Sequence, residues 1–169
     1  MTTKTATSRF RITIVLFIAG LILSGLTAFP LLLELRLVAQ VMGLGSDLSP
    51  EAQTGLAFWI LSVHQGLEHI YADYPWVGYG TDWLAFSHIV IASFFLGAFI
   101  NPKNSLHTLY SGIFACLSVI PLAFICGSIR QIPIYWRLID CSFGAIGILP
   151  LLYCLKLLKV IATREGNEA

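Results

Sequence analysis

Histidines and carboxylates are the residues of this chain whose chemistry stands out from an apolar background. His88 stands a few residues inside an uncharged run that extends from Trp83 to Ile100. An ionisable side chain inside a membrane-length apolar segment is costly and usually serves a function. His64 precedes Glu68 by one helical turn, where a carboxylate can orient an imidazole that binds a metal. The same spacing also occurs in ordinary ion pairs on helix surfaces.

Two of the histidines suggest a haem site. His64 and His88 lie in different predicted helices, so they could supply both axial nitrogens to one haem iron. His69 diverges from His64 by about 140° around a helix, so it is a substitute for His64 rather than its partner on one metal. Ala85 and Ala92 flank His88 and leave room for a flat macrocycle or, equally, for a neighbouring helix. No CxxCH motif occurs, so the group would be a noncovalent haem b.

A second group of polar residues combines arginines and aspartates. Its members are Arg130, Arg137, Asp82 and Asp140, with Glu34 and Glu68 as further carboxylates in the same predicted region. Such a cluster could fix helix ends, although buried ion pairs are weak evidence for stability. It could also bind an anionic molecule or a quinol, with Tyr79 or a carboxylate accepting protons. Gly144 and Gly147 share the face of Asp140 and predict a groove there.

Composition places these residues in a membrane protein. The 169-residue chain is 57% hydrophobic and 11% charged, and its mean hydropathy is +0.81. Soluble domains carry about 25% charged residues. A net charge of +1 without a basic patch argues against a nucleic-acid partner. The chain is therefore expected to be an all-α membrane protein that forms one transmembrane domain over residues 1–169.

Long uncharged runs predict a four-helix transmembrane bundle. The predicted spans cover about 12–37, 82–100, 107–127 and 135–159. Pro30 predicts a kink in the first span. Pro75, Gly78 and Gly80 predict a turn-rich loop before the second span, with Thr81 or Asp82 as its N-cap.

An external amphipathic helix is predicted between the first two spans, at about 50–73. Ser49, Pro50 and Glu51 have the types of an N-cap, a first helical residue and a first-turn acid. An apolar stripe follows with helical period: Leu56, Trp59, Ile60, Val63, Leu67 and Ile70. The uncharged part of this helix is short for a bilayer, so we expect it to lie at the membrane surface, with a fifth span as the alternative.

Charge distribution predicts the orientation. With a cytoplasmic N-terminus, seven cations fall on the inner side: Lys4, Arg9, Arg11, Lys103, Lys156, Lys159 and Arg164. Three fall on the other side: Arg36, Arg130 and Arg137. This excess follows the positive-inside rule and predicts that both termini are cytoplasmic. The expected location is the bacterial inner membrane, with the polar residues near the periplasmic face.

Three segments carry a resemblance to a known family. They are Ser24-Gly-Leu-Thr-Ala-Phe-Pro30, Tyr79-Gly-Thr-Asp-Trp-Leu-Ala-Phe-Ser-His88 and Ile132-Pro-Ile-Tyr-Trp-Arg-Leu-Ile-Asp-Cys-Ser-Phe-Gly144. Together they resemble a family of small bacterial multi-span membrane proteins of uncharacterised function. The resemblance implies a multi-span architecture in the bacterial envelope, and it implies no catalytic role for any residue.

These observations favour a small b-type haem protein with a redox or quinol-linked role. The enzyme class that would fit is a haem-dependent membrane oxidoreductase, with electron transfer to a quinone or to a redox partner protein. The alternative is a non-enzymatic subunit, assembly factor or small-molecule-binding module that uses the arginines and aspartates, and that forms homo- or hetero-oligomers. A third class, a metal-dependent intramembrane hydrolase, would use His64, Glu68, His88 and Asp82, but no HExxH motif occurs.

Overall fold

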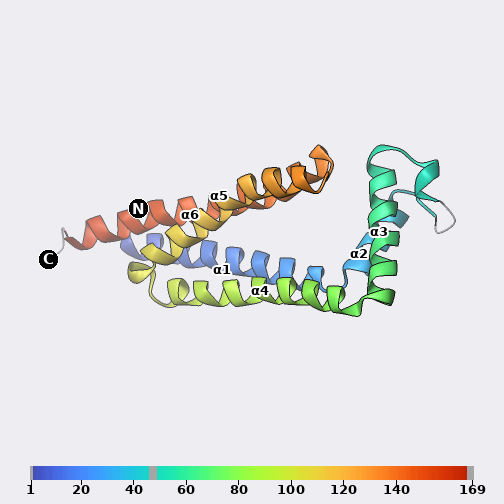
Figure 1. Cartoon of the computed structure of the whole chain (residues 1–169). Coiled ribbons are helices and arrows are strands. Elements are labelled where there is room, and N and C mark those ends of the chain that lie inside the picture. Colours follow the sequence, from blue (N-terminus) through green and yellow to red (C-terminus); the bar gives the residue numbers. More distant parts are fainter. Residues whose placement is uncertain (1, 46–48, 167–169) are drawn as a thin grey trace. The chain divides into compact units, whose positions relative to one another are not determined.

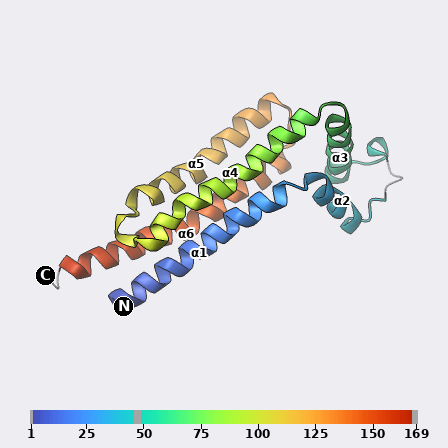
Figure 2. The same cartoon turned by 90° about the horizontal axis from the view of Figure 1, so that it is seen from below.

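The computed structural model describes residues 2–45 and 49–166, and in them the chain is built from helices (Figures 1 and 2). The α-helices are α1 (Thr3–Ala28), α2 (Leu31–Val41), α3 (Gly55–Asp73), α4 (Pro75–Ile100), α5 (Leu106–Ile129) and α6 (Ile134–Gly166). Two short 3-10 helices, η1 (Pro50–Ala52) and η2 (Pro102–Asn104), lie in the connections. The predicted all-α class is confirmed.

Four of these helices are long and apolar enough to cross a membrane: α1, α4, α5 and α6 as far as Thr163. Many of their large apolar side chains are exposed, including Leu16, Phe94, Phe114 and Phe143. Continuous apolar surface of this extent is unfavourable in water and favourable against lipid. A multi-pass membrane protein with four spanning helices therefore agrees with the sequence prediction, and α3 is not among the candidate spans.

The chain divides into two compact units, Met1–Gly20 with Ile91–Ala169 and Leu21–Val90. In the first unit, α5 and α6 pack along each other, with small residues at the contact. A Cβ atom at Gly144 would overlap the carbonyl oxygen of Cys116, so the two backbones touch there. Phe10, Ile14 and Leu151 are fully buried in this unit. Its core thus joins the start of α1 to α6.

The second unit contains the end of α1, α2, α3 and the start of α4. The helices α1 and α4 approach closely at Gly25, where a Cβ atom would lie 2.8 Å from the Ala85 carbonyl oxygen. In the same unit α2 packs on α3, and η1 also packs on α3. A single residue, Tyr74, joins α3 to α4, and the Tyr71 hydroxyl lies 3.0 Å from Thr81 Oγ1 across this joint.

The predicted first span, 12–37, is divided in the structure. Helix α1 begins at Thr3 and ends at Ala28, and residues 31–37 belong to α2. Pro30 is the reason, because its nitrogen carries no hydrogen to continue the ladder of α1. Its carbonyl instead accepts a hydrogen bond from the Glu34 nitrogen at 3.0 Å, which starts α2. Pro30 therefore separates two helices instead of kinking one.

The predicted loop before the second span is wrong. Helix α4 begins at Pro75, and Gly78 and Gly80 are helical. Proline is favoured at the first position of a helix, where its missing N–H costs nothing. Thr81 and Asp82 are therefore not N-caps, and Thr81 Oγ1 donates to the Gly78 carbonyl inside the helix at 2.7 Å.

The predicted helix 50–73 is also divided, into η1 and α3, with Gln53 and Thr54 between them. As predicted, α3 ends before Pro75. Within η1, the backbone N–H of Glu51 and then the Ser49 hydroxyl lower the pKa of the Glu51 carboxyl. Of the predicted apolar stripe, Ile60 is buried, whereas Leu56 and Ile70 are exposed.

The turn between α5 and α6 carries a strained residue. The Gln131 nitrogen donates to the Ser128 carbonyl, and the Ile132 nitrogen donates to the Gly127 carbonyl, which is the Schellman pattern of a helix C-terminus. Gln131 adopts φ 55° at the position that usually holds glycine. A side chain in this left-handed conformation costs about 1 kcal/mol.

Replacing Gln131 by glycine is therefore expected to stabilise the protein by about 0.5–1 kcal/mol. The midpoint of thermal unfolding in detergent measures the change. Gln53→Gly, at an extended position with φ −119°, is the matched control and should lower that midpoint. An unchanged or lowered midpoint for Gln131→Gly would contradict the assigned strain.

Candidate functional site

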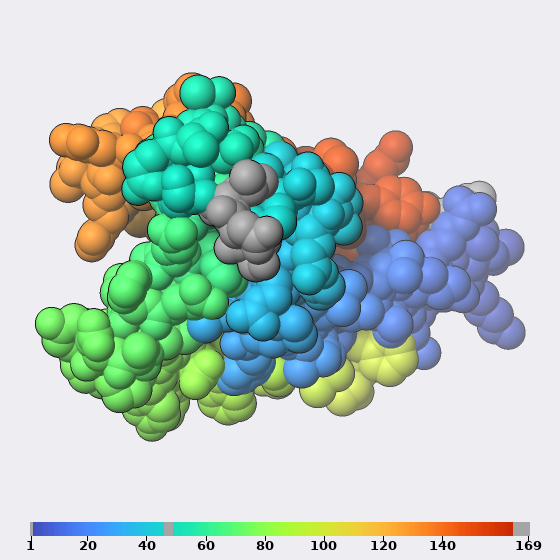
Figure 3. Space-filling view, turned by 90° about the vertical axis from the view of Figure 1, so that its right-hand side faces the viewer, coloured from blue at the N-terminus to red at the C-terminus, as the bar shows by residue number. Residues whose placement is uncertain are grey.

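The best-formed polar site lies between α2 and α3, within the second unit. These helices lie side by side on the face turned to the viewer in Figure 3. A pocket of about 540 Å³ opens between them. It is lined by Arg36, Ala39, Gln40, Leu44, Gly45, Leu61, His64, Gln65 and Glu68.

The end of α2 shapes one wall of this pocket. Gly43 has φ 72°, which glycine adopts without strain, and it follows the C-cap Met42. The Leu44 nitrogen donates to the Ala39 carbonyl at 2.8 Å, so the chain turns back over the helix end. Leu44 is buried as a result and adds an apolar side chain to the lining of the pocket.

Arg36, His64 and Glu68 form the polar side of the pocket. Arg36 Nη2 lies 3.3 Å from Glu68 Oε1, and His64 Nε2 lies 3.6 Å from the same oxygen. The Glu68 carboxylate therefore lies between a guanidinium and an imidazole. The one-turn spacing brings His64 and Glu68 close together on α3, and Arg36 approaches the same oxygen from α2.

The imidazole of His64 is the unusual member of this trio. Its side chain is 17% exposed, and its Nε2 atom is buried without a hydrogen-bond partner in the described part of the chain. The 3.6 Å separation from Glu68 Oε1 is too long for a hydrogen bond. Leaving a buried polar atom unbonded costs about 1–3 kcal/mol. A molecule in the pocket that bonded this atom would recover that cost.

His88 has a different environment on α4. Its Nδ1 donates to the Leu84 carbonyl of its own helix at 3.0 Å. A Cβ atom at Gly25 would lie 3.1 Å from the His88 Cβ, so α1 packs directly against this part of α4. Ala85 is buried by the same approach. The space beside His88 is predicted from the sequence to hold either a flat macrocycle or a neighbouring helix. Next to Ala85, it is the neighbouring helix α1 that fills it.

His64 and His88 do not share a site in the structure. They lie on opposite sides of the Tyr74 joint, and α3 extends away from the first turns of α4 (Figure 1). At 1.5 Å per residue, His64 lies about 15 Å before the joint and His88 about 21 Å after it. His69 is exposed on α3. Residues 2–45 and 49–166 contain no group of three or more histidine, cysteine and acidic side chains that could hold a metal ion.

Arg137 stabilises the turn between α5 and α6. Arg137 Nε donates to the Ile132 carbonyl at 2.6 Å, and its Nη1 donates to Ser128 Oγ at 2.8 Å. Its aliphatic stem covers Gly127, where a Cβ atom would lie 2.7 Å from Arg137 Cδ. Arg137 is thus satisfied by the α5 C-terminus, where a cation also interacts favourably with the helix dipole.

Arg130 and Asp140 line a hollow of about 310 Å³ beside Arg137. Within the described residues no ion pair joins Asp140 to either arginine. The open groove predicted beside Gly144 and Gly147 is wrong, because α5 occupies it. The Cys116 carbonyl lies over Gly144, and Cys116 Sγ would lie 3.2 Å from a Cβ atom at Gly147.

The other predicted site residues belong to the second unit and do not line the α2–α3 pocket. Asp82 and Tyr79 line a shallow hollow of about 270 Å³, together with Phe29, Trp83 and Phe86. The Tyr79 and Trp83 rings meet edge to face, with centroids 6.0 Å apart. Glu34 stands in the first turn of α2, where a carboxylate stabilises the positive end of the helix.

Comparison of the chain with models of protein families, with curated proteins and with solved structures found no match.

Two residues of this pocket escape sequence reasoning. Gln40 and Gln65 add amide groups to its lining, from α2 and α3 respectively. The signal that could have found Gln40 is Pro30, because a helix that restarts after it places Arg36 and Gln40 on one face, one turn apart. Reading residues 12–37 as one span hides that face.

Proposed function

We propose that this chain is a non-enzymatic membrane module that binds a small amphipathic molecule in the α2–α3 pocket. The observation that carries the proposal is the buried, unbonded Nε2 of His64 in a pocket with Arg36 and Glu68. The arrangement supplies a nitrogen that donates or accepts, a carboxylate that accepts and a guanidinium that donates. A few such groups among apolar lining residues are typical of specific ligand recognition.

The ligand class that fits best is a quinone or quinol headgroup. A quinone oxygen can accept a hydrogen bond from the imidazole, and a quinol hydroxyl can donate one to Glu68. The flat ring and the start of an apolar tail match Ala39, Leu44 and Leu61, which also line the pocket. The excess of cations at the other predicted side supports a pocket near the periplasmic face of the bacterial inner membrane.

Replacing His64 by leucine is expected to weaken the binding of a short-tailed ubiquinone about tenfold or more. The lost hydrogen bond to a buried atom accounts for about 1.4 kcal/mol, which corresponds to a factor of ten. Isothermal titration of the detergent-purified protein measures the dissociation constant. His69→Leu removes an exposed imidazole from the same helix and is the matched control. Equal binding by both variants, or no binding by the wild-type protein, would refute the proposal.

A haem-binding function is the second candidate, and the same atom favours it. An imidazole nitrogen without a partner can ligate haem iron, and the Arg36 guanidinium can pair with a propionate carboxylate. Haem b in this pocket would use His64 as its ligand from this chain. The bound group would supply one-electron chemistry for a redox or quinol-linked role.

An oxidised-minus-reduced visible spectrum separates the two candidates. Haem bands that are lost in His64→Leu and kept in His88→Leu would support haem in the α2–α3 pocket. Bands that are lost in His88→Leu and kept in His64→Leu would move the haem to α4. A featureless spectrum from protein made with ample haem would discard this candidate and leave the quinone proposal to its own titration.

A further inference from the structure

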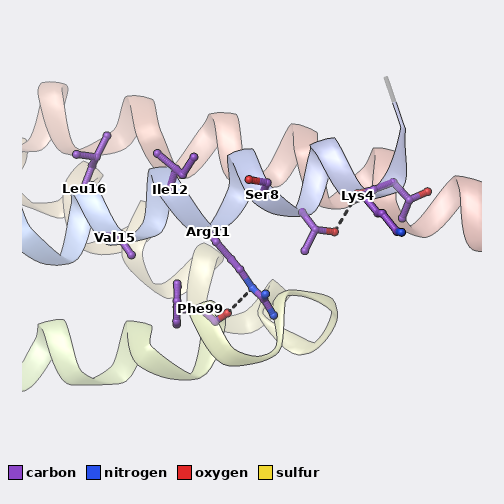
Figure 4. Close-up of a pocket in the computed structure, with 9 residues that line it drawn as sticks. Lys4, Ser8, Arg11, Ile12, Val15, Leu16 and Phe99 are labelled. Atoms are coloured by element: carbon purple, nitrogen blue, oxygen red, sulfur yellow. Dashed lines mark hydrogen bonds between the residues drawn. The ribbon is translucent and has the colours of Figure 1, made fainter.

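A groove with one basic end and one apolar end lies along the start of α1, within the first unit (Figure 4). Its volume is about 560 Å³. The polar end is formed by Thr3, Lys4, Thr7, Ser8 and Arg11, and the apolar end by Ile12, Val15 and Leu16 of α1 with Phe99 of α4. The groove thus changes from cationic to apolar along the helix axis.

Arg11 is fixed at the middle of the groove. Its Nε donates to the Phe99 carbonyl at 3.1 Å, and its Nη2 donates to the Ile100 carbonyl at 3.4 Å. Its guanidinium carbon lies 5.7 Å from the centre of the Phe99 ring. Figure 4 shows the side chain reaching from α1 towards Phe99. A guanidinium has five N–H donors, so these two bonds leave donors for an anion in the groove.

The α1 groove is lined by two cations, Lys4 and Arg11, and by no carboxylate. Lys4 makes no ion pair within residues 2–45 and 49–166. No aspartate or glutamate occurs in residues 2–20 or 91–139. Cations beside apolar helix surface favour an anionic headgroup over a zwitterionic one.

We propose that the α1 groove is a binding site for an anionic phospholipid. The phosphate would lie between Lys4 and Arg11, with the hydroxyls of Thr7 and Ser8 nearby. An acyl chain would lie on Ile12, Leu16 and Phe99, which are part of membrane-spanning helices. The apolar half of the groove is what distinguishes a lipid from a free phosphate ester, because only a lipid covers it. This site is separate from the α2–α3 pocket and does not depend on the function proposed for it.

The test is native mass spectrometry of the full chain after exchange into micelles that contain equal amounts of phosphatidylglycerol and phosphatidylcholine. The wild-type protein is expected to retain phosphatidylglycerol in preference to phosphatidylcholine. Lys4→Gln should lower this preference about fivefold, which is the effect of one cation near a lipid headgroup. The Lys4 side chain makes no hydrogen bond or ion pair with the described residues, so this variant should fold normally. Arg11→Lys keeps the charge but loses the paired donors to α4 and should lower the preference less.

Arg9→Gln is the matched control, because Arg9 lies on the same helix outside the groove. It should keep the wild-type preference. An equal loss in Arg9→Gln and Lys4→Gln would overturn the site in favour of a diffuse surface charge. Equal retention of both lipids by the wild-type protein would overturn it as well. Displacement of phosphatidylglycerol by an equal concentration of glycerol 1-phosphate would assign the cations to a soluble phosphate instead of a lipid.

Discussion

Substituting alanine for Gly144 is expected to lower the free energy of unfolding by about 3 kcal/mol, the upper part of the range for overpacked cores. The new methyl group would overlap the carbonyl oxygen of Cys116 on α5. A backbone carbonyl cannot rotate away as a flexible side chain can, so α5 and α6 must separate. Separation would also weaken the contact of Gly147 with Cys116.

Unfolding of the detergent-purified protein by a denaturing detergent measures this change. Gly97→Ala is the control, because a Cβ atom there meets nothing within 4 Å. That variant should be as stable as the wild-type protein or slightly more stable, since alanine favours a helix over glycine by about 1 kcal/mol. If Gly144→Ala and Gly97→Ala unfold at the same concentration of denaturing detergent, α5 and α6 do not approach each other closely at Gly144.

Substituting alanine for Gly25 is expected to cost about 2–3 kcal/mol in the second unit. Its methyl group would lie 2.8 Å from the Ala85 carbonyl oxygen and 3.1 Å from the His88 Cβ. The end of α1 must then move away from α4. The environment of His88 would change with it, although His88 itself is not substituted.

Two readings test this expectation. The unfolding free energy should fall for Gly25→Ala and not for Gly20→Ala, a position on the same helix with open space around it. The chemical shifts of the His88 imidazole in an NMR spectrum should change in Gly25→Ala alone. If Gly25→Ala is as stable as Gly20→Ala and leaves the His88 signal unchanged, α1 and α4 do not touch at this point.

Much of the architecture can be predicted from the sequence, because a lipid bilayer restricts the length and the polarity of the helices that cross it. A spanning helix needs about 20 apolar residues, and the runs that end at Ile100, Ile129 and beyond Leu155 satisfy that need. Helix boundaries at prolines are harder to predict, since proline both ends and begins helices. Pro30 ends the first span earlier than expected, and Pro75 begins α4 earlier than expected.

The candidate site is only partly visible in the sequence. The one-turn spacing of His64 and Glu68 predicts their pairing, because it is local to one helix. Arg36 reaches Glu68 from a helix 32 positions away in the chain, and no spacing rule predicts that contact. Small residues also carry an ambiguity, since Ala85 and Gly144 suit a flat cofactor and a neighbouring helix equally well. At Ala85 and Gly144, helix packing resolves the ambiguity in favour of the helix.

The connection between α3 and α4 is a single residue long, so it cannot absorb a change in length. With Tyr74 alone between the helices, one inserted residue would rotate α3 by about 100° relative to α4. Either the His64 face would turn away from α2, or Tyr71 would leave Gly78 and Thr81. The length of this connection therefore sets the register of the pocket.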